Sequence, residues 1–427
     1  MRILTSELPN GMRIVTHRMA GLETATVGVF VTAGARAETE NEHGVAHFLE
    51  HMAFKGTPTR TPMQIAEEIE GAGGALNAVT SAEATNYYAR VLRDDVELGL
   101  RLIADLLLNP SFSDEEMDRE REVILQEIAA TQDSPDEIVF ELALAEAYPL
   151  QPLGRSILGT ERTVSRHSAA DLKRFRSENY CASRMILSAA GAVDHDALHR
   201  IADELFGRLP SQAPRAAKRA RFSGGHAVSD KRFEQCHVLY AFEGYPNGDD
   251  AAFAGRIFTG IAGGGMASRL FQEVREKRGL CYDIHAFDWG YSDSGIVGLH
   301  AATSPQQLGQ LTTVALGIFA DLAEEGPTEK ELARAKAQIK AGLFMSLESC
   351  EARAGHLASD LMVFGRPLTN EELIAKIEGV TRDDVQAVAR RLRERPEMVS
   401  AVVGARSFSQ VVSDAAEAFQ SGARVAA

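Results

Sequence analysis

The spacing of hydrophobic and polar positions predicts groups of strands followed by groups of helices. Two short runs flank Pro9-Asn10-Gly11, a turn tripeptide, and predict a hairpin over residues 3–17. Apolar or alternating runs bounded by turn residues predict further strands. These are expected at 24–32, at 73–91 (two strands around 81–83), at 185–192 and at 398–404.

Helical patterns dominate the region that follows the first strands. Thr61-Pro62-Met63-Gln64 combines a capping box with proline at the first helical position, so a helix is expected to start there and to end at Gly71. Other helices are expected at 94–108, 113–131, 137–147, 171–177 and 195–206. The order of strands and helices favours an α+β fold over a wound parallel sheet.

One predicted helix, from Gly44 to Phe54, carries apolar residues on every side and should be buried. It nevertheless contains His47, Glu50 and His51, and burying such groups without partners costs several kcal/mol. Two histidines four positions apart lie about 40° from each other around a helix, so both imidazoles can bind one Zn²⁺. Glu50 projects beside them and could accept a proton from a metal-bound water. The simpler alternative is a pair of buried histidines satisfied by hydrogen bonds.

The second half of the chain weakly repeats the first. The helix-opening sequence at 114–119 has a counterpart at 329–334, and the strand at 185–191 has one at 398–404. Gly44-Val45-Ala46-His47 likewise aligns with Gly264-Gly265-Met266-Ala267. In this alignment His47, Glu50 and His51 correspond to Ala267, Leu270 and Phe271. We therefore expect two tandem homologous α/β sandwich units, each a mixed antiparallel sheet packed with helices, with a metal site in the first only.

A change in composition marks the boundary between the halves. Residues 213–230 are rich in Pro, Ala, Gly, Lys and Arg and lack apolar periodicity, which predicts an exposed linker. The predicted domains are an N-terminal zinc-binding domain, 1–212, and a C-terminal homologous domain, 231–427.

Composition narrows the function classes. The net charge of −15 over 427 residues argues against nucleic-acid binding. It would suit a chamber that attracts basic peptides, although from composition alone an acidic soluble surface is the better explanation. No apolar run is long enough to span a membrane, and no signal or transit sequence is evident at the N-terminus. The four cysteines are scattered, so we expect free thiols and a cytoplasmic protein.

His47-Phe48-Leu49-Glu50-His51 has the order of the inverted zinc-protease signature. Together with the following residues to Thr57 it resembles the pitrilysin family of metallopeptidases, especially its processing-peptidase branch. Residues 120–127 resemble the family's second motif, which implies that Glu127 is the third ligand of one Zn²⁺ per chain and that Glu120 supports the site from behind. Without the resemblance, any glutamate of this helix is a candidate and a solvated helix face is the simpler interpretation: Glu115, Glu116, Glu120, Glu122 and Glu127.

Two further segments extend the resemblance. Residues 271–282 are similar to the family's C-terminal pattern, which implies that Arg275 holds the substrate backbone and that Tyr282 donates a hydrogen bond to the reacting carbonyl. Asn77 and Ala78 lie in a segment that resembles the substrate-binding edge strand. From the residues alone, the first segment would be a surface helix followed by a strand, and the second a closed hairpin with Asn77 at a turn.

The resemblance implies a zinc metalloendopeptidase that hydrolyses short, unfolded peptides in a chamber between paired chains. Glu50 would be the general base. A homodimer is expected, with a heterodimer containing a zinc-less homologous chain as the alternative. The rival functions are a dedicated processing protease for one precursor and a non-catalytic assembly subunit, although the latter predicts a broken zinc motif. Zinc storage would leave Glu50 without a role.

Overall fold

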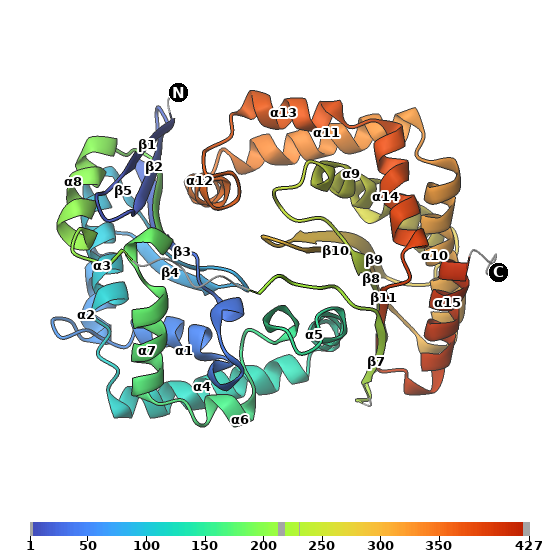
Figure 1. Cartoon of the computed structure of the whole chain (residues 1–427), viewed down its shortest axis with the longest axis horizontal. Coiled ribbons are helices and arrows are strands. Elements are labelled where there is room, and N and C mark those ends of the chain that lie inside the picture. Colours follow the sequence, from blue (N-terminus) through green and yellow to red (C-terminus); the bar gives the residue numbers. More distant parts are fainter. Residues whose placement is uncertain (1–2, 212–217, 230, 422–427) are drawn as a thin grey trace. The chain divides into compact units, whose positions relative to one another are not determined.

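The computed structural model describes residues 3–211, 218–229 and 231–421 (Figure 1). The chain forms two compact units, each built on one sheet and its helices. Unit 1 comprises Met1–Ala129, Ser156–Lys218 and Leu343–Leu368. Unit 2 comprises Ala130–Arg155, Arg219–Gly342 and Thr369–Ala427. Among the described residues, no helix is both long and apolar enough to cross a membrane.

The sheet of unit 1 has six strands in the order β1-β2-β6-β3-β5-β4. Neighbours are antiparallel except β2 and β6, which run parallel. The hairpin and the other strands predicted for this region are confirmed. Their bounds are β1 Ile3–Glu7, β2 Arg13–Arg18, β3 Thr24–Val31, β4 Ala75–Thr80, β5 Thr85–Leu92 and β6 Met185–Gly191.

Both faces of this sheet are covered, which explains why β3 and β6 are nearly continuous apolar runs. Successive strand residues point to opposite faces. Accordingly, Val27 and Val29 of β3 pack in the main core with α3, whereas Phe30 packs with Leu357 and Leu361 of α12. The helices are α1 Val45–Ala53, α2 Pro62–Gly71, α3 Val96–Leu108, α4 Asp114–Gln132, α6 Glu161–Val164, α7 Ala169–Asn179, α8 His195–Phe206 and α12 Cys350–Phe364.

Among the described residues, the sheet of unit 2 has the same topology without an equivalent of β1. Its order is β7-β11-β8-β10-β9, again with one parallel pair, β7 and β11, at the first position. The five strands of unit 2, in this order, correspond to β2, β6, β3, β5 and β4 of unit 1. The shared strand order confirms the predicted α+β fold of two tandem homologous units. The bounds are β7 Gly225–Ser229, β8 Cys236–Glu243, β9 Asp283–Gly290, β10 Gly295–Thr303 and β11 Met398–Val403.

The helices of unit 2 cover its own sheet, with α5 packed on β8, β11 and β7. They are α5 Pro135–Ala147, α9 Ala251–Gly263, α10 Leu308–Glu325, α11 Glu329–Ser346, α13 Asn370–Gly379, α14 Arg382–Glu394 and α15 Ser409–Ser421. A π-helical segment, η6 Phe271–Glu276, precedes β9. In the alignment of the two halves, its first residue, Phe271, is the counterpart of His51 at the end of α1.

Two features of the structure differ from the predicted order of one domain, an exposed linker and a second domain. First, each unit is discontinuous, because α5 packs in unit 2 and α12 packs in unit 1. These units are defined by packing, so the division into homologous domains 1–212 and 231–427 stays a prediction. Second, residues 225–229 of the predicted linker form β7, paired in register with β11. This strand is only five residues long and is surrounded by small and basic residues, which conceals its pattern. The linker positions 213–217 and 230 lie outside the described residues.

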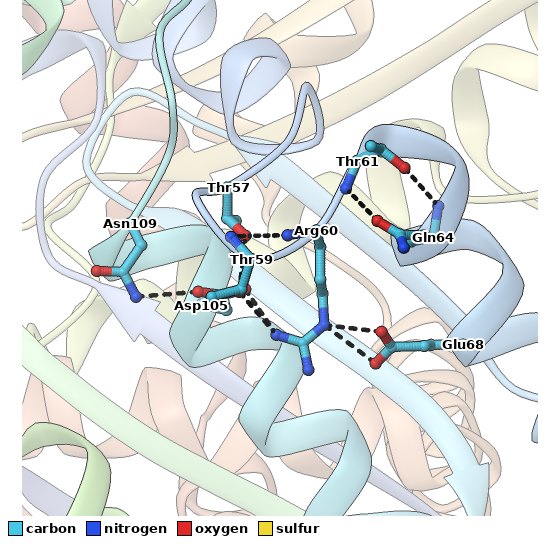
Figure 2. A network of polar contacts seen from close by, with 8 residues as sticks. All are labelled: Thr57, Thr59, Arg60, Thr61, Gln64, Glu68, Asp105 and Asn109. Carbon is cyan, nitrogen blue, oxygen red and sulfur yellow. Dashed lines mark hydrogen bonds and ion pairs between the residues drawn. The ribbon is translucent and has the colours of Figure 1, made fainter.

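A polar network holds the segment that follows α1 (Figure 2). The Asp105 carboxylate of α3 accepts hydrogen bonds from Thr57 Oγ1 at 2.8 Å and from Arg60 at 2.8 Å. Arg60 also donates to both oxygens of Glu68 on α2 at 3.0 Å. The predicted capping box between Thr61 and Gln64 is present. The network therefore ties the end of the two-histidine helix to α2 and α3.

Candidate metal centre

The start of α1 is fixed by a close approach of two glycine backbones. Gly44 has φ +91°, and a Cβ there would lie 2.8 Å from both Gly159 Cα and the Leu158 carbonyl oxygen. Only glycine meets both conditions without strain. Glu38 then anchors the helix, because its carboxylate accepts hydrogen bonds from the backbone N–H groups of Gly44 (3.0 Å) and Ala46 (2.8 Å). A buried negative charge at a helix N-terminus is stabilised by these free donors.

α1 presents His47 and His51 one turn apart, with their ring centroids 4.6 Å from each other. The third group comes from α4, where Glu127 Oε2 lies 3.6 Å from His47 Nε2 and 3.7 Å from His51 Nε2. One ligand atom from each of the three residues lies within 4.8 Å of the others. Zinc bonds of about 2.0–2.1 Å in a tetrahedral arrangement place neighbouring ligand atoms about 3.3 Å apart, so a small contraction would complete such a centre.

The protonation states also suit a metal. Burial lowers the pKa of His47 to about 4, and the neighbouring His51 contributes in the same direction. His47 is therefore neutral at pH 7, which is the form that binds a cation. His51 Nδ1 lies 3.0 Å from Glu120 Oε2. Placing the proton on Nδ1 satisfies this hydrogen bond and leaves the Nε2 lone pair facing Glu127.

Glu120 is itself buried and held by a second partner. Its other carboxylate oxygen lies 2.6 Å from the Lys55 ammonium, just after the end of α1. This ion pair compensates the cost of burying the Glu120 charge. The chain Lys55, Glu120, His51 thus orients one of the imidazoles that could bind a metal.

Glu50 is half-buried, and its Oε2 atom has no hydrogen-bond partner among the described residues. A buried carboxylate oxygen without a partner is unusual and needs a compensating group such as a water or an ion. Two tyrosines are close enough to Glu50 to interact with it electrostatically, Tyr87 and Tyr180. Their hydroxyls lie 3.1 Å apart and are hydrogen-bonded to each other. Burial raises the pKa of Tyr180 to about 12, and the Glu50 charge adds to that rise.

The predicted peptide-binding residues lie on the edge of the same unit. β4 is the last strand of its sheet, and it packs beside α1. Asn77 is exposed and its side-chain oxygen accepts a hydrogen bond from the backbone N–H of Ala78 at 2.9 Å. Asn77 therefore lies within a strand and not at a turn.

Arg275 and Tyr282 belong to unit 2, where they contact each other. The Arg275 guanidinium lies 4.5 Å from the ring centroid of Phe271 and 4.7 Å from that of Tyr282. Tyr282 is 78% exposed, so its hydroxyl is available to a ligand. Arg275 is on the π-helical segment η6, a rare conformation that often occurs at functional sites.

Sequence reasoning missed three contributors to the centre. Glu38 lies six residues before the predicted start of the two-histidine helix and is 4% exposed. An acidic residue shortly before a predicted helix start was the available signal for it. Lys55 follows His51 by four positions, which placed it near the same helix face. Only the fold could bring Tyr180 to Tyr87.

The chain is similar to a family of peptidases over most of its length. Residues 13–161 match the insulinase family, peptidase family M16, and residues 166–339 match the peptidase M16 inactive domain. A protein named as an uncharacterized zinc protease of Rickettsia felis is 37% identical over 91% of this chain and 94% of the relative. A relative with the same description from Streptomyces coelicolor is 36% identical over 92% of this chain and 88% of its own. YmxG of Bacillus subtilis, also named as an uncharacterized zinc protease, is 33% identical over 90% of this chain and 94% of its own.

Solved structures share the fold. The peptidase M16 inactive domain from Pseudomonas fluorescens superposes with a TM-score of 0.88 at 22% identity, covering 95% of this chain and 98% of that one. A protease from Helicobacter pylori gives a TM-score of 0.86 at 21% identity, covering 94% and 99%. At these identities the two structures establish the architecture alone.

Proposed function

The chain belongs to peptidase family M16, and from this premise we propose that it is a zinc-dependent metalloendopeptidase that hydrolyses short, unfolded peptides. The observation that carries the proposal is the convergence of His47, His51 and Glu127 on one point, with Glu50 beside them. A storage site would need the three ligands but would not need a carboxylate with an unused acceptor.

His47 Nε2, His51 Nε2 and Glu127 Oε2 would hold Zn²⁺, and Glu120 would keep the His51 ring in place. Bound Zn²⁺ supplies a Lewis acid and lowers the pKa of a coordinated water to near neutrality. Glu50 would accept the proton of the attacking water and return it to the leaving amine. Tyr282 would donate a hydrogen bond to the reacting carbonyl oxygen, and Arg275 would hold the peptide backbone.

The edge strand β4 supports an extended peptide as the substrate. Among the described strands β4 has only β5 as a neighbour, so its outer main-chain groups can pair with an added strand. Main-chain pairing through the segment around Asn77 and Ala78 tolerates many sequences but requires an unfolded chain. The net charge of −15 favours basic peptides.

We also propose that the protein acts as a pair of chains that enclose the substrate. The support is the resemblance of residues 271–282 to a motif that acts on a peptide held at the zinc centre. A homodimer is the simpler arrangement, because one chain carries both sets of residues. A zinc-less homologous partner is the alternative, and a mass measurement of the native complex separates the two.

The test combines zinc content with cleavage of a quenched fluorescent basic peptide. Glu50→Gln should keep zinc at the centre and lose activity by a factor of about 10²–10⁴, because only the general base is removed. His51→Gln should lose both. Glu67→Gln, an exposed change of the same kind on α2, should alter neither. Undiminished cleavage by Glu50→Gln would overturn the mechanism.

A second outcome distinguishes the rivals. Zinc-loaded wild type that cleaves many members of a peptide library supports a general peptidase, whereas cleavage of one sequence only indicates a dedicated processing protease. Zinc-loaded wild type that cleaves none, alone or with its copurifying partner, would favour an assembly subunit.

A further inference from the structure

A second group of histidines and a carboxylate lies on the sheet of unit 2. β9 begins with Asp283, and His285 lies on the same face two residues later. The register of β9 and β10 places His285 directly opposite His300 and Asp283 opposite Ala302. Residues opposite each other in antiparallel strands share a face and lie close together. Pairing between the two strands therefore gathers the three side chains.

The distances in this group resemble those at the first centre. Asp283 Oδ2 lies 3.3 Å from His285 Nδ1 and 3.7 Å from His300 Nδ1. One ligand atom from each of the three residues lies within 4.8 Å of the others. His300 is 3% exposed, and its Nδ1 has no hydrogen-bond partner among the described residues. A buried polar atom in that condition is costly, and it faces the Asp283 carboxylate.

The neighbours of His300 fix its ring in this orientation. Its Nε2 lies 3.1 Å from Nδ1 of His237 on β8, and its ring lies against Phe140 of α5 at 5.4 Å between centroids. Asp136, at the start of α5, interacts electrostatically with His237. If His300 donates its Nε2 proton to His237, its Nδ1 lone pair faces Asp283.

Protonation agrees with this geometry. Burial lowers the pKa of His300 to about 4, with further contributions in the same direction from His285 and His237. His300 is therefore neutral at pH 7 and can offer its Nδ1 lone pair to a cation. Asp283 is exposed and His285 is half-buried, so solvent reaches the group from one side and water could complete the coordination.

We propose that Asp283, His285 and His300 form a second divalent-cation site, of the class that binds Zn²⁺. Two imidazoles and a carboxylate are the ligand set that suits this ion. His237 would act on His300 as Glu120 acts on His51, by accepting the proton of the nitrogen that does not face the ion. A bound cation would attach the first residue of β9, which directly follows Tyr282, to β10.

The test uses a variant that lacks the first centre, so its outcome does not depend on the proposed peptidase activity. Apo-protein carrying His47→Gln and His51→Gln is dialysed against Zn²⁺ and its metal content is measured. One Zn²⁺ per chain is expected. Adding Asp283→Asn and His285→Gln should weaken binding by about 100-fold or more. The side chains of Asp283 and His285 are 55% and 42% exposed, so folding should survive; thermal unfolding of the apo-protein checks this.

Two comparisons make the result decisive. His226→Gln, at an exposed histidine of β7 on the opposite edge of the same sheet, should leave binding unchanged. Replacing Zn²⁺ by Co²⁺ should give visible absorption that disappears with Asp283→Asn and His285→Gln. Absence of stoichiometric Zn²⁺ in the variant lacking the first centre, or equal binding after the Asp283 and His285 changes, would overturn the proposal.

Discussion

Glu120 Oε2 lies 3.0 Å from His51 Nδ1, and this contact joins the two helices that carry the predicted zinc ligands. The carboxylate fixes the tautomer and the ring orientation of the histidine, so that Nε2 points towards Glu127. Because Glu120 is buried, the interaction is little screened by solvent. The residue that supports the site from behind is therefore as much a part of the site as the groups that would touch the metal.

Replacing Glu120 by glutamine should weaken zinc binding by about 10- to 100-fold, because the amide retains the shape of the side chain but loses the charge that makes His51 a better ligand. Competition with a calibrated chelator measures this affinity. Glu122→Gln, on the exposed face of the same helix, is the matched control. Equal affinities in the two variants would show that Glu120 has only a structural role.

Changes at Arg275 and Tyr282 should affect catalysis but not zinc content. Tyr282→Phe removes one hydroxyl donor and should lower kcat by about 10²–10³-fold. Arg275→Lys keeps the charge but loses the planar guanidinium, so KM should rise. Tyr282 is exposed, so the unfolding temperature should stay the same. Arg278→Lys, at the arginine that forms an ion pair with Glu273, controls for a general charge effect. Full activity in both Arg275→Lys and Tyr282→Phe would remove these residues from the mechanism.

Gly44→Ala should destabilise the protein by about 2–4 kcal/mol, since the new Cβ adds a backbone clash to the strain of a positive φ. Zinc affinity should fall with it, because the clash displaces the start of α1. Gly21→Ala is the informative control: its φ is +84°, but no atom lies within 4 Å of the added Cβ. That change should cost only about 1 kcal/mol. Chemical denaturation of the apo-proteins measures both, and similar costs would mean that the Gly44–Gly159 approach is unimportant.

The ion pair between Glu331 and Arg269 should make part of the stability depend on pH. Burial acts to raise the pKa of Glu331, but hydrogen bonds from Arg269 and Thr328 outweigh it and lower the pKa to about 2. A carboxylate whose pKa is lower in the folded state stabilises the fold at higher pH. This contribution is complete above about pH 4.5, the ordinary glutamate value, and is lost as the pH falls towards 2.

Glu331→Gln should therefore lower the free energy of unfolding at pH 7 by about 1–2 kcal/mol after solvent screening is allowed for. The difference from wild type should shrink between pH 4.5 and pH 2. Urea unfolding at pH 7 and pH 3 measures it, with Glu371→Gln, an exposed change on α13, as the control. A difference that is the same at both pH values would contradict the predicted linkage.

Local signals were sufficient for most elements of unit 1. Pro9-Asn10-Gly11 and the capping box at Thr61 specify their turn and helix start by chemistry that acts within a few residues. The spacing of His47 and His51 likewise predicts two ligand positions on one helix. The predicted third ligand was different: seven residues separate Glu120 from Glu127, both on one helix, and only family resemblance distinguished their predicted roles.

The remaining features depend on contacts between distant segments. His237, His285 and His300 are spread over three strands, and only the register of β8, β9 and β10 brings them together. Strand β7 exists because β11, far along the chain, supplies its partner. Neither arrangement leaves a periodic pattern in the local sequence, so local reasoning had no means to find them.

The packing of α5 in unit 2 and of α12 in unit 1 limits where the chain can be cut into separately expressed fragments. Helix α5 is encoded before residues 213–230 but covers the sheet built after them, and α12 is encoded after them but covers the first sheet. Fragments expressed from either side of that stretch would each carry a helix that belongs to the other. Neither fragment should be autonomous, because one face of each sheet would lie bare and prone to aggregation. Co-expression of both should restore solubility by complementation.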